Sequence, residues 1–193
     1  MKIYLLERDA KNYRWMEYKG NWFEFFWKLL DSEPLGKFEK KIKWKTIREP
    51  KEIRMSDYPV FSVPAISQKA YDVLSDSFLG LAEIFPLAPN KKYGQYYFMN
   101  IINLLDCLDV EKSDLKFCSD GKRIMVIKRY VFQEKILDMN TTIFKLKNKR
   151  RGGIYVNEET KLLIENARLE GFIFTQVWDS EDPDFVYEPR RIF

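Results

Sequence analysis

The feature that most constrains the fold is an irregular succession of short strand-like and helix-like segments. Strand patterns, rich in aromatic and β-branched residues or alternating in polarity, occupy residues 3–7, 41–46, 95–102, 123–132, 142–147 and 172–178. Helical spacing of apolar residues occurs in residues 21–30, 67–80 and 157–171. The order shows neither a βαβ rhythm nor a repeat of about 20–50 residues. We therefore predict an α+β fold, with a largely antiparallel sheet and several packed helices.

Local signals mark the ends of these helices. Ser67 and Asn157 are expected N-caps, because their side-chain oxygens can accept hydrogen bonds from the first helical N–H groups. Gly80 and Gly171 are expected to end the same two helices, with Gly171 in the left-handed region at the C′ position. Residues 83–89 are expected to form an apolar connection, and residues 103–109 are compatible with a further helix. Ser119-Asp120-Gly121 is a strong turn signal, and Asn21 is a plausible N-cap for the helix expected at residues 21–30.

The length of 193 residues fits a single domain. We expect one compact domain over residues 1–193, with an N-terminal segment at 1–57, a main core at 58–179 and a tail at 180–193. An apolar content of 46% is too high for a disordered chain.

The absence of histidine excludes more function classes than any other count. Ser-His-Asp and Cys-His catalysis need an imidazole base, and most zinc and non-haem iron sites need imidazole ligands. No phosphate-binding or dinucleotide-binding glycine motif is present. Asp106, Asp109 and Glu111 could form a carboxylate cluster on a helix, but a solvated helix end explains them better. We expect no catalytic residue, metal ligand or cofactor.

We expect no signal for export or membrane insertion in this sequence. The apolar run at residues 3–6 is too short for a signal peptide, and no stretch approaches the roughly 18 apolar residues of a membrane helix. Cys107 and Cys118 stand apart without a paired motif, so we expect two reduced thiols. These features predict a cytoplasmic protein without a membrane partner.

The segment NWFEFFWKLL, residues 21–30, has an apolar face wider than a core-facing helix needs. At 100° per residue the apolar arc spans about 200°, against roughly 100° for a helix packed on one side. Phe23 and Trp27 lie at the edge of this arc. They are either covered by the basic segment 37–54 or exposed as anchors for a protein partner.

Charged residues gather in three places, although the formal net charge is only +4. Four acids follow the last expected strand, and could steer a basic partner or form a solvated tail: Asp179, Glu181, Asp182 and Asp184. Residues 37–54 and 145–151 are basic and could contact phosphates. Solvated lysines on a loop or an edge strand explain both basic segments without a ligand.

An ordered series of segments resembles a known family. The series is NWFEFFWKLLDSEPLG, VPAISQKAYDVL, YYFMNIINLLDCLD, EKSDLKF, RIMVIKRYVF, TIFKLK and IYVNEETKLLIENARLEGFIFTQVWD. It is similar to the immunity proteins of bacterial polymorphic toxin systems typified by a myxobacterial immunity domain. The resemblance extends from about Trp22 to Asp179, and its specificity lies in the order of the segments.

The resemblance implies a cytoplasmic, non-enzymatic protein that binds and neutralises a cognate toxin domain. It carries over no catalytic residue, and it does not place the interface, because toxin contacts vary within such families. The candidate partner-binding residues therefore remain those derived above: Phe23, Trp27, Asp179, Glu181, Asp182 and Asp184. The alternative is a nucleic-acid-binding module that uses the basic segments 37–54 and 145–151.

Overall fold

The computed structural model describes all residues except 21–22, 40–41, 48–53, 138–140, 183 and 188–193. The strands of the described part are β1 (Lys2–Arg8), β2 (Trp15–Lys19), β3 (Lys43–Ile47), β4 (Ala65–Ser67), β5 (Ala82–Pro86), β6 (Tyr96–Ile101), β7 (Leu104–Leu105), β8 (Asp114–Phe117), β9 (Ile124–Arg129), β10 (Ile143–Leu146), β11 (Ile154–Asn157) and β12 (Phe172–Asp179). The helices are α1 (Phe23–Leu30), α2 (Gln68–Leu74) and α3 (Glu158–Asn166), with a short 3-10 turn, η1, at Lys147–Lys149.

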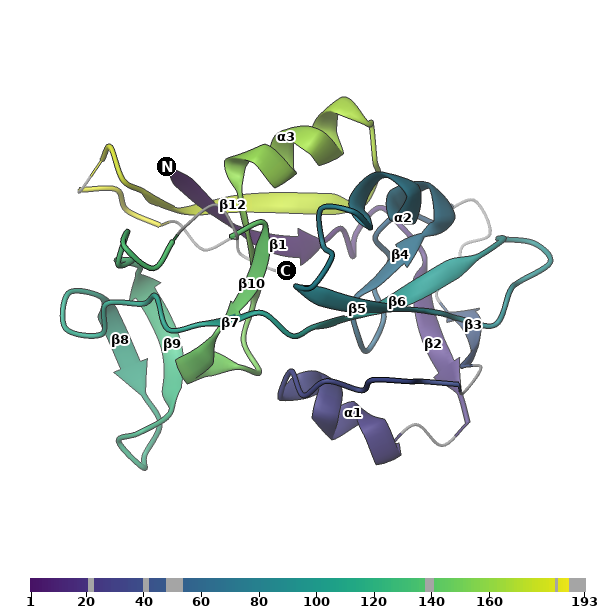
Figure 1. The fold of residues 1–193 in the computed structure, drawn as a ribbon, viewed down its shortest axis with the longest axis horizontal. Helices are drawn as coiled ribbons and strands as arrows, with labels where there is room; N and C mark the ends of the chain where they lie inside the picture. The colour runs from purple at the N-terminus through teal and green to yellow at the C-terminus, as the bar shows by residue number, and fades with distance from the viewer. Residues whose placement is uncertain (21–22, 40–41, 48–53, 138–140, 183, 188–193) are drawn as a thin grey trace.

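The largest sheet has five strands in the order β12-β1-β11-β10-β7. Its pairings are antiparallel except for the short β7–β10 pair. β1 lies between β11 and β12, so the first strand of the chain is flanked by two of the last ones (Figure 1). α3 connects β11 to β12 and packs against β1 and β11, because the connection must cross over β1 to reach its far side.

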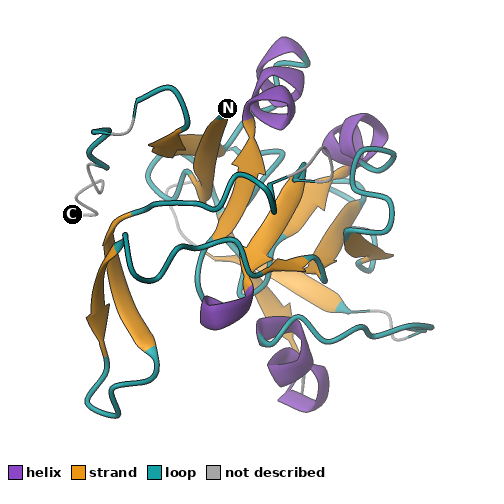
Figure 2. Cartoon of the chain, turned by 60° about the vertical axis from the view of Figure 1, so that its left-hand side comes forward, coloured by secondary structure: helices purple, strands orange, loops and turns teal. Residues whose placement is uncertain are grey.

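Three smaller sheets surround this one in the described part of the chain. β4, β6 and β5 form an antiparallel sheet beside α2, β2 pairs with β3, and β8 pairs with β9. The β8–β9 hairpin projects from the body in both views (Figures 1 and 2), and its tip is the predicted Ser119-Asp120-Gly121 turn.

The prediction of an α+β fold with several packed helices is wrong. The structure is rich in β-strands spread over several sheets, and the three α-helices among the described residues have only eight, seven and nine residues. Two segments account for part of the error. Residues 83–89, expected as a connection, contribute β5, and residues 103–109, considered as a helix, contribute β7. Both are short apolar runs whose spacing fits either structure, and pairing with β6 and β10 decides the outcome.

The expected N-caps of α2 and α3 are confirmed. The Ser67 Oγ accepts a hydrogen bond from the Ala70 N–H, and the Asn157 Oδ1 accepts one from the Thr160 N–H. The N-cap Asn21 considered for α1 would lie outside the described residues.

The prediction that Gly171 is the C′ residue of α3 is wrong. Arg168 holds that position, with a φ of 51°. The Leu169 N–H donates to the Ile164 carbonyl and the Arg168 N–H to the Glu165 carbonyl, which is the bond pattern of a Schellman motif. Gly171 also has a positive φ, of 86°, but its reason is different. A β-carbon there would lie 2.4 Å from Cβ of Ser56, so the chain needs glycine for a close approach.

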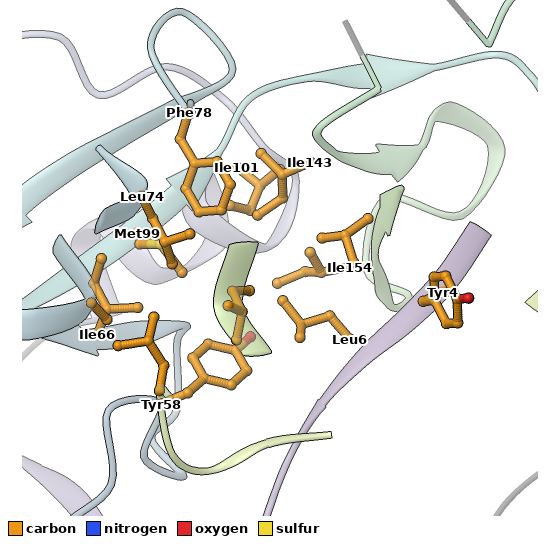
Figure 3. Packing of buried hydrophobic residues seen from close by; sticks show 14 residues of the cluster. Tyr4, Leu6, Tyr58, Ile66, Leu74, Phe78, Met99, Ile101, Ile143 and Ile154 are labelled. Atoms are coloured by element: carbon orange, nitrogen blue, oxygen red, sulfur yellow. The ribbon is translucent and has the colours of Figure 1, made fainter. Parts of the chain in front are cut away.

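Where the structure describes the chain, apolar side chains form three buried clusters. The first lies between the large sheet, the β4-β6-β5 sheet and the helices α2 and α3, and Figure 3 shows Leu6 of β1 beside Ile154 of β11 within it. The second covers the opposite face of the large sheet, where Phe144, Tyr155 and Trp178 meet the β8–β9 hairpin. The third joins α1, β2 and β3 to the outer face of the three-stranded sheet.

Cys107 and Cys118 are both free, as predicted. In the part of the chain that the structure describes, no helix has the length and apolar character needed to cross a membrane.

Candidate partner-binding surfaces

The exposed edge of α1 is formed by Trp27. Half of its surface is accessible (50%), although its ring also contacts Phe26 edge-on with 5.7 Å between the ring centroids. Burial of Trp27 under the basic segment, the other possibility left open by the sequence, is therefore not what the structure shows. Phe23 is the first residue of α1, and its side chain lies outside the described part of the structure.

Arg151 covers one face of the exposed tryptophan. Its guanidinium carbon lies 5.1 Å from the centroid of the Trp27 ring. The same guanidinium donates two hydrogen bonds to Asp31, from Nε to Oδ1 at 2.7 Å and from Nη2 to Oδ2 at 2.8 Å. These hydrogen bonds lower the pKa of the Asp31 carboxyl below its usual value. The fork therefore fixes the cation over the aromatic ring, where attraction to the ring quadrupole adds to the ion pair.

Beside this pair lies a cavity of about 230 Å³ between α1, β1, the segment 62–64, β10 and the start of β11. Its apolar walls include Leu6, Leu29 and Ile154. Its cations are Arg8, Lys145 and Arg151, and none of the described residues that line it is acidic. We call this cavity the cationic cleft.

Lys145 is the buried cation of the cleft. Only 7% of its surface is accessible. Its Nζ donates to the carbonyls of Leu29 and Leu30, at 3.3 and 3.5 Å, at the C-terminal end of α1. Burial lowers the pKa of the Lys145 amine to about 8, while the charge of Asp31 acts in the opposite direction. An ordinary lysine has a pKa of about 10.4. At mildly alkaline pH, a large fraction of the Lys145 amine is therefore in its neutral form.

From the sequence alone, the signal for the role of Lys145 is weak. The pattern TIFKLK predicts a strand in which Lys145 follows Phe144 and precedes Leu146, and this strand is confirmed as β10. All four β10 residues are buried, so the alternation of one exposed and one buried face does not hold here. A lysine within a short apolar strand was the available signal, but it cannot show which distant groups surround it.

The acidic segment lies at the end of β12, far from α1 in both views (Figures 1 and 2). Asp179 is partly buried and its Oδ1 accepts a hydrogen bond from the Glu181 N–H at 3.1 Å. Glu181, Asp182 and Asp184 are exposed, and Asp182 accepts from the Asp184 N–H at 3.2 Å. The candidate residues thus form two separate surfaces rather than one.

Most cations of the segment 145–151 are engaged by the protein itself. Lys145 is buried in the cleft and Arg151 binds Asp31. Lys147 lies 3.7 Å from a carboxylate oxygen of Asp106, and Lys149 donates to the carbonyls of residues 124 and 125 at the edge of β9.

The segment 37–54 is described only in part, since 40–41 and 48–53 lie outside the described residues. In the described part, Lys45 pairs with Glu17 at 2.8 Å, and Arg54 pairs with Glu170 at 2.7 Å.

The carboxylates considered for catalysis do not share a helix face. Asp106 follows the short strand β7 and pairs with Lys147. Asp109 begins a turn in which its Oδ1 accepts hydrogen bonds from the N–H groups of Glu111 and Lys112. The Lys112 N–H is also the main cause of the lowered pKa of Asp109. Among the described residues, no group of three or more Cys, Asp or Glu side chains is arranged to hold a metal ion.

Comparison with known families identifies the class of the protein. A model of the immunity protein family (Imm11) matches residues 49–179, which is more than half of the chain. The chain therefore belongs to the immunity proteins, and its family is Imm11. The resemblance found in the sequence is confirmed, and α1 with Trp27 lies N-terminal to the matched residues. A comparison with curated proteins found no match.

Proposed function

We propose that this chain is a cytoplasmic immunity protein that neutralises a cognate toxin domain by stoichiometric binding, without catalytic turnover. Membership in the immunity protein family supports the general role. One observation carries the choice of surface: Trp27 is half exposed and is held against Arg151 at the rim of the cationic cleft. The toxin is expected to bind there.

Tryptophan and arginine are the residue types most enriched among the energetically dominant positions of protein interfaces. Here Asp31 fixes Arg151 through two hydrogen bonds, and Arg151 in turn packs on Trp27. A side chain that is already ordered loses less conformational entropy when a partner covers it. The pair is therefore suited to act as a rigid anchor.

The acidic segment is a second candidate surface, because three carboxylates project from one turn: Glu181, Asp182 and Asp184. Long-range attraction from such a group raises the association rate with a basic partner more than it raises the lifetime of the complex. The two surfaces thus predict different kinetic effects.

The nucleic-acid alternative receives less support from the structure. A phosphate-binding segment needs cations that are free to release counterions on contact with the nucleic acid. Four of the five cations of residues 145–151 are instead engaged by carboxylates, carbonyls or burial.

The test is co-expression with the toxin domain encoded next to this gene, followed by gel filtration and binding kinetics. We expect rescue of growth, a one-to-one complex, and an increase of at least about tenfold in the dissociation rate for Trp27→Ala, as for an interface anchor. Leu162→Ala on α3 is the matched control, because Leu162 is similarly exposed, at 47%, and should leave the rate unchanged.

If the acidic segment forms the interface, the combined change of Asp179, Asp182 and Asp184 to Asn should instead slow association and flatten its salt dependence. Equal cell death with and without this protein, together with no complex on gel filtration, would show that the proposed function is wrong.

A further inference from the structure

The cationic cleft holds more positive charge than its own walls neutralise. Its lining includes three cations and no described acidic residue. Asp31 is the nearby carboxylate, but both of its oxygens already accept hydrogen bonds from Arg151. Arg8 donates to the carbonyl of Phe61 and lies over the Tyr58 ring at 5.7 Å. Among the described residues, the charged groups of the other two cations, Lys145 and Arg8, therefore contact neutral carbonyls and an aromatic ring.

The unneutralised positive charge of the cleft is centred on Lys145. Its amine is buried, and its hydrogen bonds to the Leu29 and Leu30 carbonyls are long, at 3.3 and 3.5 Å. Buried charges in proteins are usually paired with an opposite charge. The helix end supplies only partial negative charge, so an entering anion would gain a strong partner in a site of low dielectric constant.

We propose that the cationic cleft receives the side-chain carboxylate of an acidic residue of the toxin. This inference rests on the proposed function and specifies its chemistry. The cleft is continuous with the proposed anchor, because Arg151 both lines the cleft and packs on Trp27. Its apolar walls, formed by Leu6, Leu29 and Ile154, suit the methylene groups of an aspartate or glutamate side chain.

The charges around Lys145 define a pH dependence. Asp31 after α1 raises the pKa of Lys145, whereas Arg8 of β1 and Arg150 and Arg151 of the following loop add positive charge to the same region. With a pKa of about 8, the free protein loses this proton at mildly alkaline pH. A bound carboxylate would keep the Lys145 amine protonated. The affinity of the cleft for the carboxylate should therefore fall by up to about tenfold per pH unit above pH 8.

The experiment measures the dissociation constant of the complex with the toxin domain at pH 7.0 and pH 9.0. We expect Lys145→Met to raise the constant at least about tenfold at pH 7.0, and to flatten the pH dependence seen in the original protein. Lys147→Met is the matched control: Lys147 lies two residues away, is exposed and does not line the cleft. It should change the constant less than twofold and keep the pH dependence.

The outcomes separate this inference from the proposed function. A missing complex for the original protein would contradict the proposed function itself. If Lys145→Met and Lys147→Met bind the toxin domain equally well, the inference is wrong and the proposed function still stands. If inorganic phosphate binds the isolated protein in a Lys145-dependent way while toxin affinity is unaffected by Lys145→Met, the cleft serves a free anion and the inference is also wrong.

Circular dichroism checks that Lys145→Met is folded. If it is not, the original protein and Lys147→Met still decide: equal affinity at pH 7.0 and 9.0 for both would overturn the inference.

Discussion

The helices α1 and α3 end in the same backbone motif and yet serve different purposes. In α3 the C′ residue is Arg168, and in α1 it is Ser32, with φ values of 51° and 59°. In α1 the Glu33 N–H donates to the Lys28 carbonyl and the Ser32 N–H to the Leu29 carbonyl, as the corresponding groups do in α3. Local geometry therefore does not distinguish the two ends.

Their surroundings do distinguish them. The residue after the left-handed position of α3 is Leu169, which is buried in the first core cluster with Ile164. The end of α1 instead meets the amine of Lys145 from a strand more than a hundred residues away. The first arrangement closes the end of a helix against the core, whereas the second leaves a charged cleft beside an exposed tryptophan. A candidate site is thus recognised by what distant segments supply.

The largest expected effect tests whether the connection between α3 and β12 depends on distant contacts too. Gly171→Val should lower the free energy of unfolding by about 3 kcal/mol, because strain at positive φ and overpacking add together. The overpacking arises where a β-carbon would lie 2.4 Å from Cβ of Ser56.

Gly80→Val is the matched control, since Gly80 has a φ of 77° and open space around it. It should cost only about 1–2 kcal/mol. Chemical denaturation measures both variants, and equal losses would show that the contact with Ser56 does not matter.

The second expected effect concerns the α1 end and its pH dependence. Because the Lys145 pKa is lower in the folded protein than in the unfolded chain, the unfolded chain binds more protons between about pH 8 and pH 10.5. The cost of burying this charge is complete below pH 8 and disappears as pH rises through this window. The free energy of unfolding should therefore rise by about 2 kcal/mol from pH 7 to pH 9.5, relative to Lys145→Met.

Other groups also titrate in this range, so the measured quantity is the difference between the original protein and the variant at each pH. Parallel stability curves for the two proteins would contradict the assignment of a buried, titrating lysine to the cleft.

The smallest expected effect concerns the start of α3. Asn157→Ala should cost about 1 kcal/mol, the usual loss for an N-cap. Its Oδ1 accepts hydrogen bonds from the Thr160 N–H at 2.9 Å and from the Thr160 hydroxyl at 2.8 Å. Thermal unfolding measures the change. A loss near 3 kcal/mol would show that Asn157 also stabilises the sheet through β11. It would then weaken the contrast between α3, which local contacts stabilise, and α1, whose end contacts a distant strand.

The features predicted from sequence are those fixed within a few residues. The caps at Ser67 and Asn157 and the turn at residues 119–121 depend on neighbouring atoms, and all three are confirmed. The strands β5 and β7 were missed because their apolar spacing is ambiguous and their partners are distant in sequence. The balance between helix and strand was therefore wrong, even though several separate elements were placed correctly.

The residues of the candidate site also differ in whether local sequence or distant contacts determine them. Trp27 was singled out because a wide apolar arc is visible in the sequence of one helix, although its exposure had to be seen in the structure. The sequence places Lys145 where a predicted strand meets the basic segment 145–151, and this pattern predicts a solvated lysine. Its burial depends on α1, β1 and β11 packing around it, and these elements come from opposite ends of the chain.

The position of β1 has a consequence for the timing of protection. Ile3 pairs with Asn157 on one side and with Trp178 on the other, so the central sheet cannot close until the residues up to Trp178 have been synthesised. At a translation rate of about 5–20 residues per second, the partners of β1 leave the ribosome many seconds after β1 itself. A cell that makes toxin and immunity protein together therefore benefits if synthesis of the immunity protein starts first.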